Sequence, residues 1–141
     1  MEMETRTYLF NHLIWCTADR KQLLKKPLLK VLMGYLHSWS EKNLVRILHI
    51  NGMPDHLHCL IQLHPTQSLS QIVRSMKTDS AQWIGENKIT EEEFAWEDGY
   101  IAYSVSPSSI AQVGEYIEKQ EKHHETKTLD NELEVLGKIR I

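Results

Sequence analysis

The segment LVRILHINGMPDHLHCLIQL, residues 44–63, contains two apolar runs on either side of the turn-forming pairs NG and PD. The runs, 44–50 and 56–63, are rich in β-branched and other large apolar residues, as strands are. A connection this short joins antiparallel neighbours. The segment therefore predicts two antiparallel strands joined by a short turn, a β-hairpin.

The sequence on either side of the hairpin supplies two further strands and three helices. Strands are expected over 7–17 and 100–106, and helices over 21–42, from Ser68 through Trp83, and from Pro107 to about His124. The order β-α-β-β-α-β is that of a ferredoxin-like α+β fold, an antiparallel sheet with helices on one face, and a further C-terminal helix follows it. No repeat or linker divides residues 1–141, so we expect a single domain.

Two histidines of the second run, His56 and His58, project from the same face of the expected strand, about 7 Å apart along the chain. The alternating apolar residues are expected to pack on the helices; they are Leu57, Cys59, Ile61 and Leu63. The histidines should then lie on the opposite, solvated face of the sheet. Such a pair suits a divalent metal ion, but two hydrogen-bonding surface histidines explain the spacing equally simply.

The last expected helix places Tyr116 and Gln120 on one face, because they are four residues apart. By itself this spacing is a common accident that needs no function. Gly114, inside the same helix, costs about 1 kcal/mol relative to alanine and indicates a loose joint or a close approach.

Composition indicates an ordinary globular protein, with 41% hydrophobic and 25% charged residues. The net charge of −3 does not suggest a nucleic-acid-binding protein, since these usually lean basic. Positive charge is nevertheless concentrated near the start of the first helix, in Arg20, Lys21, Lys25, Lys26 and Lys30. This cluster is either a local phosphate-binding surface or an ordinary solvated exterior.

The two cysteines, Cys16 and Cys59, lie within apolar stretches and give no disulfide framework, which fits a reducing cytoplasm. The first ten residues lack the apolar core of a signal peptide. No run approaches the roughly 18 apolar residues that a membrane span requires. We therefore expect a cytoplasmic protein that does not enter the membrane.

Several stretches taken together are more informative than either candidate site alone. NGMPDHLH (51–58) and YIEKQEKHH (116–124), with NHLIWCTADR (11–20) and FAWEDGYIAYSVSPS (94–108), resemble the single-tyrosine HUH transposases of small insertion sequences, of the 200/605 type. The resemblance runs from about residue 7 to residue 128. Its motifs occur in the family's order and at workable separations.

The resemblance implies a DNA transposase that cleaves and rejoins single-stranded DNA at element ends. In that family two histidines and a glutamine bind Mg²⁺ or Mn²⁺, and a tyrosine on the last helix attacks DNA to give a 5′-phosphotyrosine. Carried over, these are His56, His58 and Gln120 as metal ligands and Tyr116 as nucleophile. The implied substrate is single-stranded DNA with hairpin ends. Phosphates would be contacted by Arg20, Lys21, Lys25 and Lys26, and bases would stack on Trp or Tyr.

A homodimer is also expected, with active sites shared between subunits. The resemblance implies it, and so does the short connection after strand 100–106, which leaves little chain for the last helix to reach back to its own histidines. Two alternatives stay open. One is a domesticated relative that binds hairpin DNA without transposition. The other is a structural metal-binding domain, although the cysteine spacing of such domains is missing.

Overall fold

The computed structural model describes residues 3–120, together with residues 129 and 133. The strands are β1 (Phe10–Cys16), β2 (Arg46–Met53), β3 (His56–Gln62) and β4 (Ile101–Val105). The helices are α1 (Lys26–Lys42), α2 (Leu69–Glu86) and α3 (Ile110–Glu118), with short 3-10 turns η1 (Ala18–Arg20) and η2 (Pro107–Ser109). This order confirms the α+β fold expected from the sequence.

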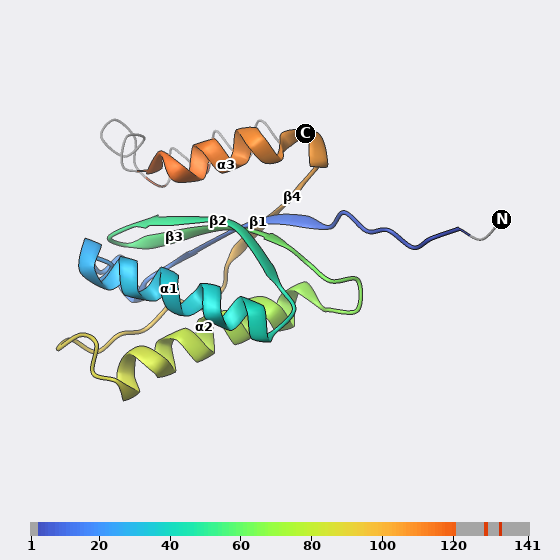
Figure 1. Ribbon diagram of the computed structural model, residues 1–141. Helices are drawn as coiled ribbons and strands as arrows, with labels where there is room; N and C mark the ends of the chain where they lie inside the picture. The colour runs from blue at the N-terminus through green and yellow to red at the C-terminus, as the bar shows by residue number, and fades with distance from the viewer. Residues whose placement is uncertain (1–2, 121–128, 130–132, 134–141) are drawn as a thin grey trace.

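The strands form one sheet in the order β2-β3-β1-β4, with every neighbouring pair antiparallel. The hairpin predicted from residues 44–63 is the β2–β3 pair, and β3 occupies an interior position. Helices α1 and α2 lie on one face of the sheet, and α3 lies on the other (Figure 1). The sheet is therefore covered on both faces, and β3 contributes to both interfaces.

The larger hydrophobic core lies between the sheet and helices α1 and α2. It contains the predicted alternating set, Leu57, Cys59 and Ile61 of β3 and Leu63 just after the strand. Leu32 and Leu36 of α1, both without exposed surface, pack against them. Trp15 and Trp39 are buried there too, as expected from the sequence. Period-two alternation in β3 and helical periodicity in α1 thus identify this core correctly.

A smaller core lies under α3, on the face that the sequence analysis expected to be solvated. Its buried members are Phe10, Leu60, Val105 and Ile117. The expectation of a wet face is wrong, because α3 folds over the sheet and excludes water from its centre. The histidines of β3 are accordingly interior side chains.

The helix ends differ from the sequence expectations in three places. Helix α1 begins at Lys26 and not at residue 21, because Pro27 fits only the first turn of a helix; a 3-10 turn with left-handed φ values at Asp19 (55°) and Arg20 (51°) lies before it. The final helix was expected to reach His124, but α3 ends at Glu118 and residues 121–124 lie outside the described residues. Ser68 occupies the N-cap position of α2, yet its hydroxyl makes no capping hydrogen bond.

Within residues 3–120 and the two further described positions, none of the helices combines the length and apolar character that a bilayer crossing needs.

Candidate metal and nucleophile site

The two histidines of β3 are fully buried beneath α3. His56 and His58 have no exposed surface, and their ring centroids are 5.2 Å apart. In the sheet register they lie opposite Cys16 and Ile14 of β1. Alternation along β3 therefore brings both rings to the same face, as the sequence predicted, but into the protein interior.

Each ring uses one nitrogen in a hydrogen bond that fixes its orientation. His56 Nδ1 lies 2.7 Å from Asp55 Oδ1, and His58 Nδ1 lies 2.8 Å from His12 Nε2. The hydrogen bond from His56 holds the pKa of the Asp55 carboxyl below its usual value, with Arg20 adding a smaller electrostatic contribution. Since Nδ1 is engaged in both rings, Nε2 is the nitrogen that each presents to a ligand. Metal-binding histidines are held in this way by outer partners.

His12 of β1 is a buried member of the site that the sequence analysis did not identify. It is 2% exposed, and its ring centroid lies 5.1 Å from that of His58. Alternation along β1 places His12 on the face of Phe10 and Ile14. Once β1 is known to pair with β3, this alternation predicts that His12 lies on the same face as the histidines of β3. A lone histidine in a strand gave no reason to propose that pairing.

Tyr116 reaches this group from α3 of the same chain. Its ring centroid is 5.9 Å from that of His58 and 6.3 Å from that of His12, in edge-on arrangements. The argument that the last helix cannot reach its own histidines is therefore wrong. The turn η2 reverses the chain tightly after β4 and lays α3 back across its own sheet.

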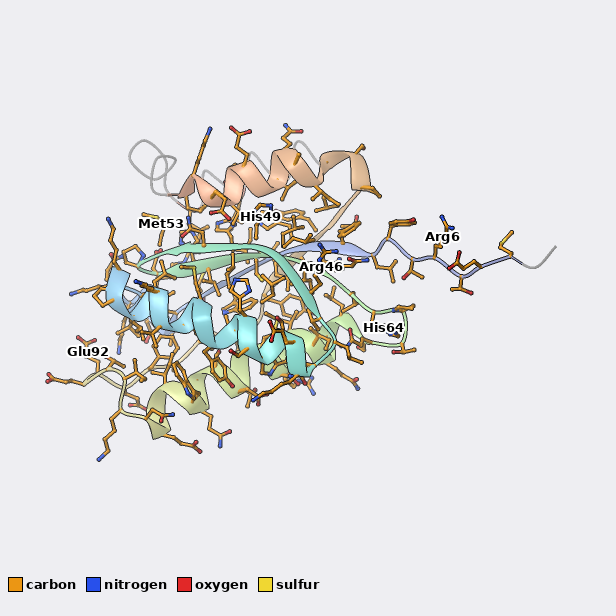
Figure 2. All side chains as sticks on the ribbon, in the orientation of Figure 1. Arg6, Arg46, His49, Met53, His64 and Glu92 are labelled. Carbon is orange, nitrogen blue, oxygen red and sulfur yellow. The ribbon has the colours of Figure 1, made fainter. Side chains whose placement is uncertain are left out.

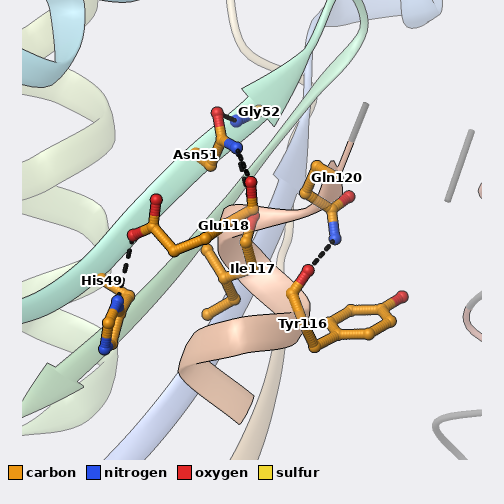
Figure 3. Close-up of polar contacts among 7 residues, drawn as sticks. All are labelled: His49, Asn51, Gly52, Tyr116, Ile117, Glu118 and Gln120. Atoms are coloured by element: carbon orange, nitrogen blue, oxygen red, sulfur yellow. Dashed lines mark hydrogen bonds and ion pairs between the residues drawn. The ribbon is translucent and has the colours of Figure 1, made fainter. Parts of the chain in front are cut away.

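Gln120 is fully buried and lies two residues after Glu118, the last residue of α3. Its Nε2 donates to the Tyr116 carbonyl at 3.3 Å (Figure 3). The other amide atom, Oε1, is buried and has no hydrogen-bond partner in the part of the chain that the structure describes. Among the described residues no three His, Cys, Asp or Glu side chains form a metal-binding group. Two histidine nitrogens and this amide oxygen are nevertheless a donor set that suits a divalent ion of the Mg²⁺ or Mn²⁺ type.

The predicted DNA-binding cations lie at one end of the sheet. Arg20, Lys21, Lys25 and Lys26 are all exposed. Lys26 and Lys30 line a groove of about 500 Å³ against the β2–β3 turn, and Glu118 at the end of α3 lines it as well. Lys26 and Lys30 therefore lie beside the end of the helix that carries Tyr116.

A second basic pair, Arg74 and Lys77, lines another groove of about 440 Å³ beside residues 94–100. The Lys77 ammonium is used there internally, because it donates to the carbonyls of Glu97 (2.7 Å) and Gly99 (2.6 Å). Burial lowers the pKa of Lys77. Its role is to hold the segment that leads into β4.

Comparison with known sequences identifies the family of this chain. A family model described as "Transposase IS200 like" matches residues 5–120. The transposase TnpA of ISDra2, from Deinococcus radiodurans, is 30% identical over 114 residues, which cover 77% of this chain and 81% of that protein.

Solved structures agree with the sequence comparison. A crystal structure from Deinococcus radiodurans, described as that of a candidate transposase, aligns with a TM-score of 0.66 at 25% identity, covering 85% of this chain and 97% of that one. A REP-associated tyrosine transposase bound to a REP hairpin has the same fold, with a TM-score of 0.64 at 17% identity over 88% of this chain and 74% of that one. The chain belongs to the IS200-like transposase family.

Proposed function

We propose that this transposase cleaves and rejoins single-stranded DNA at the ends of its element through a 5′-phosphotyrosine on Tyr116. The observation that carries the proposal is the half-buried Tyr116 ring lying edge-on to the buried His58, with His56 beside it and the buried Gln120 amide bonded to the Tyr116 carbonyl. Structural histidines and tyrosines need no such convergence. Metal-assisted nucleophilic catalysis, by contrast, requires the nucleophile to lie close to the metal ligands.

The groups that would hold a divalent ion are Nε2 of His56, Nε2 of His58 and Oε1 of Gln120. Bound there, Mg²⁺ or Mn²⁺ would neutralise charge on the scissile phosphate and polarise its phosphorus. Mixed nitrogen and oxygen donors favour Mn²⁺ in affinity, whereas cellular supply decides which ion is used. Asp55 and His12 orient the two rings, so that the donor set is preorganised.

Tyr116 supplies the attacking oxygen. A free tyrosine has a pKa near 10, so little phenolate is present at neutral pH and the site must favour the anion at the moment of attack. The attack leaves a 5′-phosphate on Tyr116 and a free 3′-hydroxyl on the departing strand. Because the phosphotyrosine preserves the phosphodiester's energy, a 3′-hydroxyl can reverse the step without ATP. Rejoining follows from the same chemistry.

The proposed DNA substrate is single-stranded, with a hairpin near each end of the element. The hairpin bound by the REP-associated transposase, a protein of the same fold, supports this substrate class. Lys26 and Lys30, on the groove beside Glu118, are placed to contact phosphates of a strand entering the site. Arg20, Lys21 and Lys25, which are exposed and precede Lys26 in the chain, are proposed to add further phosphate contacts.

The proposal is tested by covalent capture. The protein is incubated with Mn²⁺ and a single-stranded oligonucleotide copying the hairpin-bearing flank of its gene, and the products are separated under denaturing conditions. The wild type should give an adduct that survives denaturation, and Tyr116→Phe should give none while still binding the hairpin. An adduct with the phenylalanine variant would overturn the assignment. Hairpin binding without any wild-type adduct would favour a binding protein that has lost transposition.

The metal ligands are tested by His56→Ala and His58→Ala. Each should abolish the adduct and weaken Mn²⁺ binding. Both rings are buried, so some loss of stability is also expected, and Mn²⁺ affinity must be measured on the folded fraction. Unchanged Mn²⁺ affinity in both folded variants would contradict the ligand assignment.

We further propose a cytoplasmic protein whose residues 1–141 form one domain and which works as a homodimer. A partner is not needed to bring Tyr116 to a histidine pair, because α3 does so within one chain.

Subunit exchange distinguishes sites shared between subunits from sites built within one chain. In this experiment a His56→Ala/His58→Ala protein is mixed with a Tyr116→Phe protein. Recovered cleavage in verified heterodimers would require a site shared between subunits. Persistent inactivity would favour sites built within one chain.

A further inference from the structure

Strand β2 contains a bulge that changes which of its side chains face α3. Ile47 pairs with Ile61 and packs into the core under α1 and α2, but the register then shifts, and His49 pairs with Leu60. Leu48 is the extra residue, and it packs with the core under α3. Without the bulge, residues two and four positions after Ile47 would share its face. The bulge turns His49 and Asn51 toward α3 instead.

Both side chains bind the end of α3. Asn51 Nδ2 donates to the carbonyls of Ile117 (3.2 Å) and Glu118 (3.1 Å) (Figure 3). Asn51 Oδ1 accepts the Gly52 N–H at 2.9 Å, which fixes the orientation of the amide. His49 Nδ1 lies 3.0 Å from Glu118 Oε1, and in Figure 2 His49 lies between β2 and α3. The last carbonyls of a helix have no donors within the helix, so these bonds satisfy them.

The source of this cap distinguishes α3 from the other two helices. Helices α1 and α2 are each capped by the asparagine that directly follows them: Asn43 donates to Trp39 O, and Asn87 donates to Trp83 O. Helix α3 is followed by Lys119, and its cap comes from β2, far away in the sequence. The end of α3 is thereby fixed relative to the sheet and not only relative to itself.

The carbonyls that Asn51 caps, those of residues 117 and 118, lie in the sequence between Tyr116 and Gln120. Lys119 leaves the helical conformation, with φ −99° and ψ 26°, so Gln120 does not simply continue the face of Tyr116. The direction of Gln120 depends on where the end of α3 is held. Asn51 is also the register partner of His58, so the same residue connects the helix end to the strand of the histidine pair.

We propose that Asn51 is a positioning residue, which fixes the end of α3 so that Gln120 Oε1 faces the nitrogens of His56 and His58. The inference rests on the proposed function, because it concerns the ligand set of that site. Asn51 acts through the carbonyls of residues 117 and 118. The β2 bulge is the local structure that makes this contact available.

The test uses Asn51→Asp, which keeps the shape of the side chain and removes the donor. Mn²⁺ affinity without DNA, followed by electron paramagnetic resonance of the free ion, should fall about 10-fold or more. The single-turnover rate of adduct formation at saturating DNA should fall similarly. Asn43→Asp is the matched control, since it removes an amide–carbonyl bond at the end of α1 and should alter neither quantity.

Asn51→Ala is the second variant, because it removes the donor without adding charge. A merely structural role would lower the fraction of active molecules and leave the rate constant and the Mn²⁺ affinity of the folded fraction unchanged. That result, or loss of folding in both Asn51 variants, would overturn the inference. A wild type that forms no adduct would overturn the proposed function instead, while the Mn²⁺ titration would still test Asn51.

Discussion

Gly114, in the interior of α3, gives a direct test of whether this helix rests on its own sheet. The Cβ of an alanine there would lie 2.5 Å from His49 Cδ2 and 3.0 Å from His49 Cε1, closer than carbon atoms approach without a shift. The smaller residue therefore allows β2 and α3 to meet. A close approach, and not a loose joint, accounts for Gly114.

The size of the effect follows from two opposing contributions. Alanine in place of a helix-interior glycine gains about 1 kcal/mol. Against this, one of two costs in stability applies. If the His49 ring turns away, it loses its Glu118 partner, which costs about 0.2–1 kcal/mol for an exposed pair. If α3 lifts instead, overpacking costs about 1–3 kcal/mol. The His49 side chain is 34% exposed, so it has room to turn. Gly114→Ala should then stabilise the wild type by less than about 1 kcal/mol if the ring turns, or destabilise it by up to about 2 kcal/mol if α3 lifts.

Without the His49 ring, the full contribution of alanine's higher helix propensity to stability should become measurable. In a His49→Ala background, Gly114→Ala should stabilise the protein by about 1 kcal/mol, because only the helix propensity changes. Urea unfolding of the four proteins gives the coupling free energy, which equals the cost of turning the ring or lifting the helix and should exceed about 0.5 kcal/mol. Effects that add to within about 0.5 kcal/mol would refute the close approach, and with it the docking of α3 on its own β2.

Three further predictions concern the larger core and the site. Asp55→Asn should weaken Mn²⁺ binding about 10- to 100-fold, because the partner that orients His56 becomes a weaker acceptor; unchanged affinity measured by calorimetry would contradict this. Leu32→Ala should cost about 2–5 kcal/mol in urea unfolding and the adjacent, exposed Val31→Ala less than about 0.5 kcal/mol; similar costs would contradict the assigned face of α1. The Cys59 thiol, whose pKa is raised by burial, should react with a thiol reagent only as the protein unfolds, and rapid reaction in the native state would argue against its burial.

Much of the fold was predictable, because local chemistry and tertiary structure agree across most of the chain. The alternation of Leu57, Cys59 and Ile61 predicts the face of β3 that packs on α1 and α2, and the short turn before His56 predicts the hairpin. The spacing of Tyr116 and Gln120 and the histidine pair were found from sequence as well. Their meeting in one place depends on tertiary structure that no spacing reveals.

The missed features all depend on contacts between distant segments. His12 became informative only through its pairing with β3, and the burial of His56 and His58 required knowing that α3 returns over the sheet. The β2 bulge inverts the alternation expected for His49 and Asn51, and a single sequence gives no sign of a one-residue register shift. The helix end at Glu118 is set partly by an amide from β2. Local propensity could not have located it.

The central claim is that Tyr116 is the nucleophile, and mapping the covalent link tests it most directly. Trypsin leaves Tyr100, Tyr103 and Tyr116 on one peptide, since it cuts after Lys88 and Lys119. A glutamate-specific protease, cutting after Glu115 and Glu118, isolates Tyr116 with Ile117 and Glu118. Mass spectrometry of the nuclease-trimmed adduct should find a 5′-phosphonucleotide on that tripeptide. A nucleotide found instead on the peptide carrying Tyr100 or Tyr103 would contradict the account.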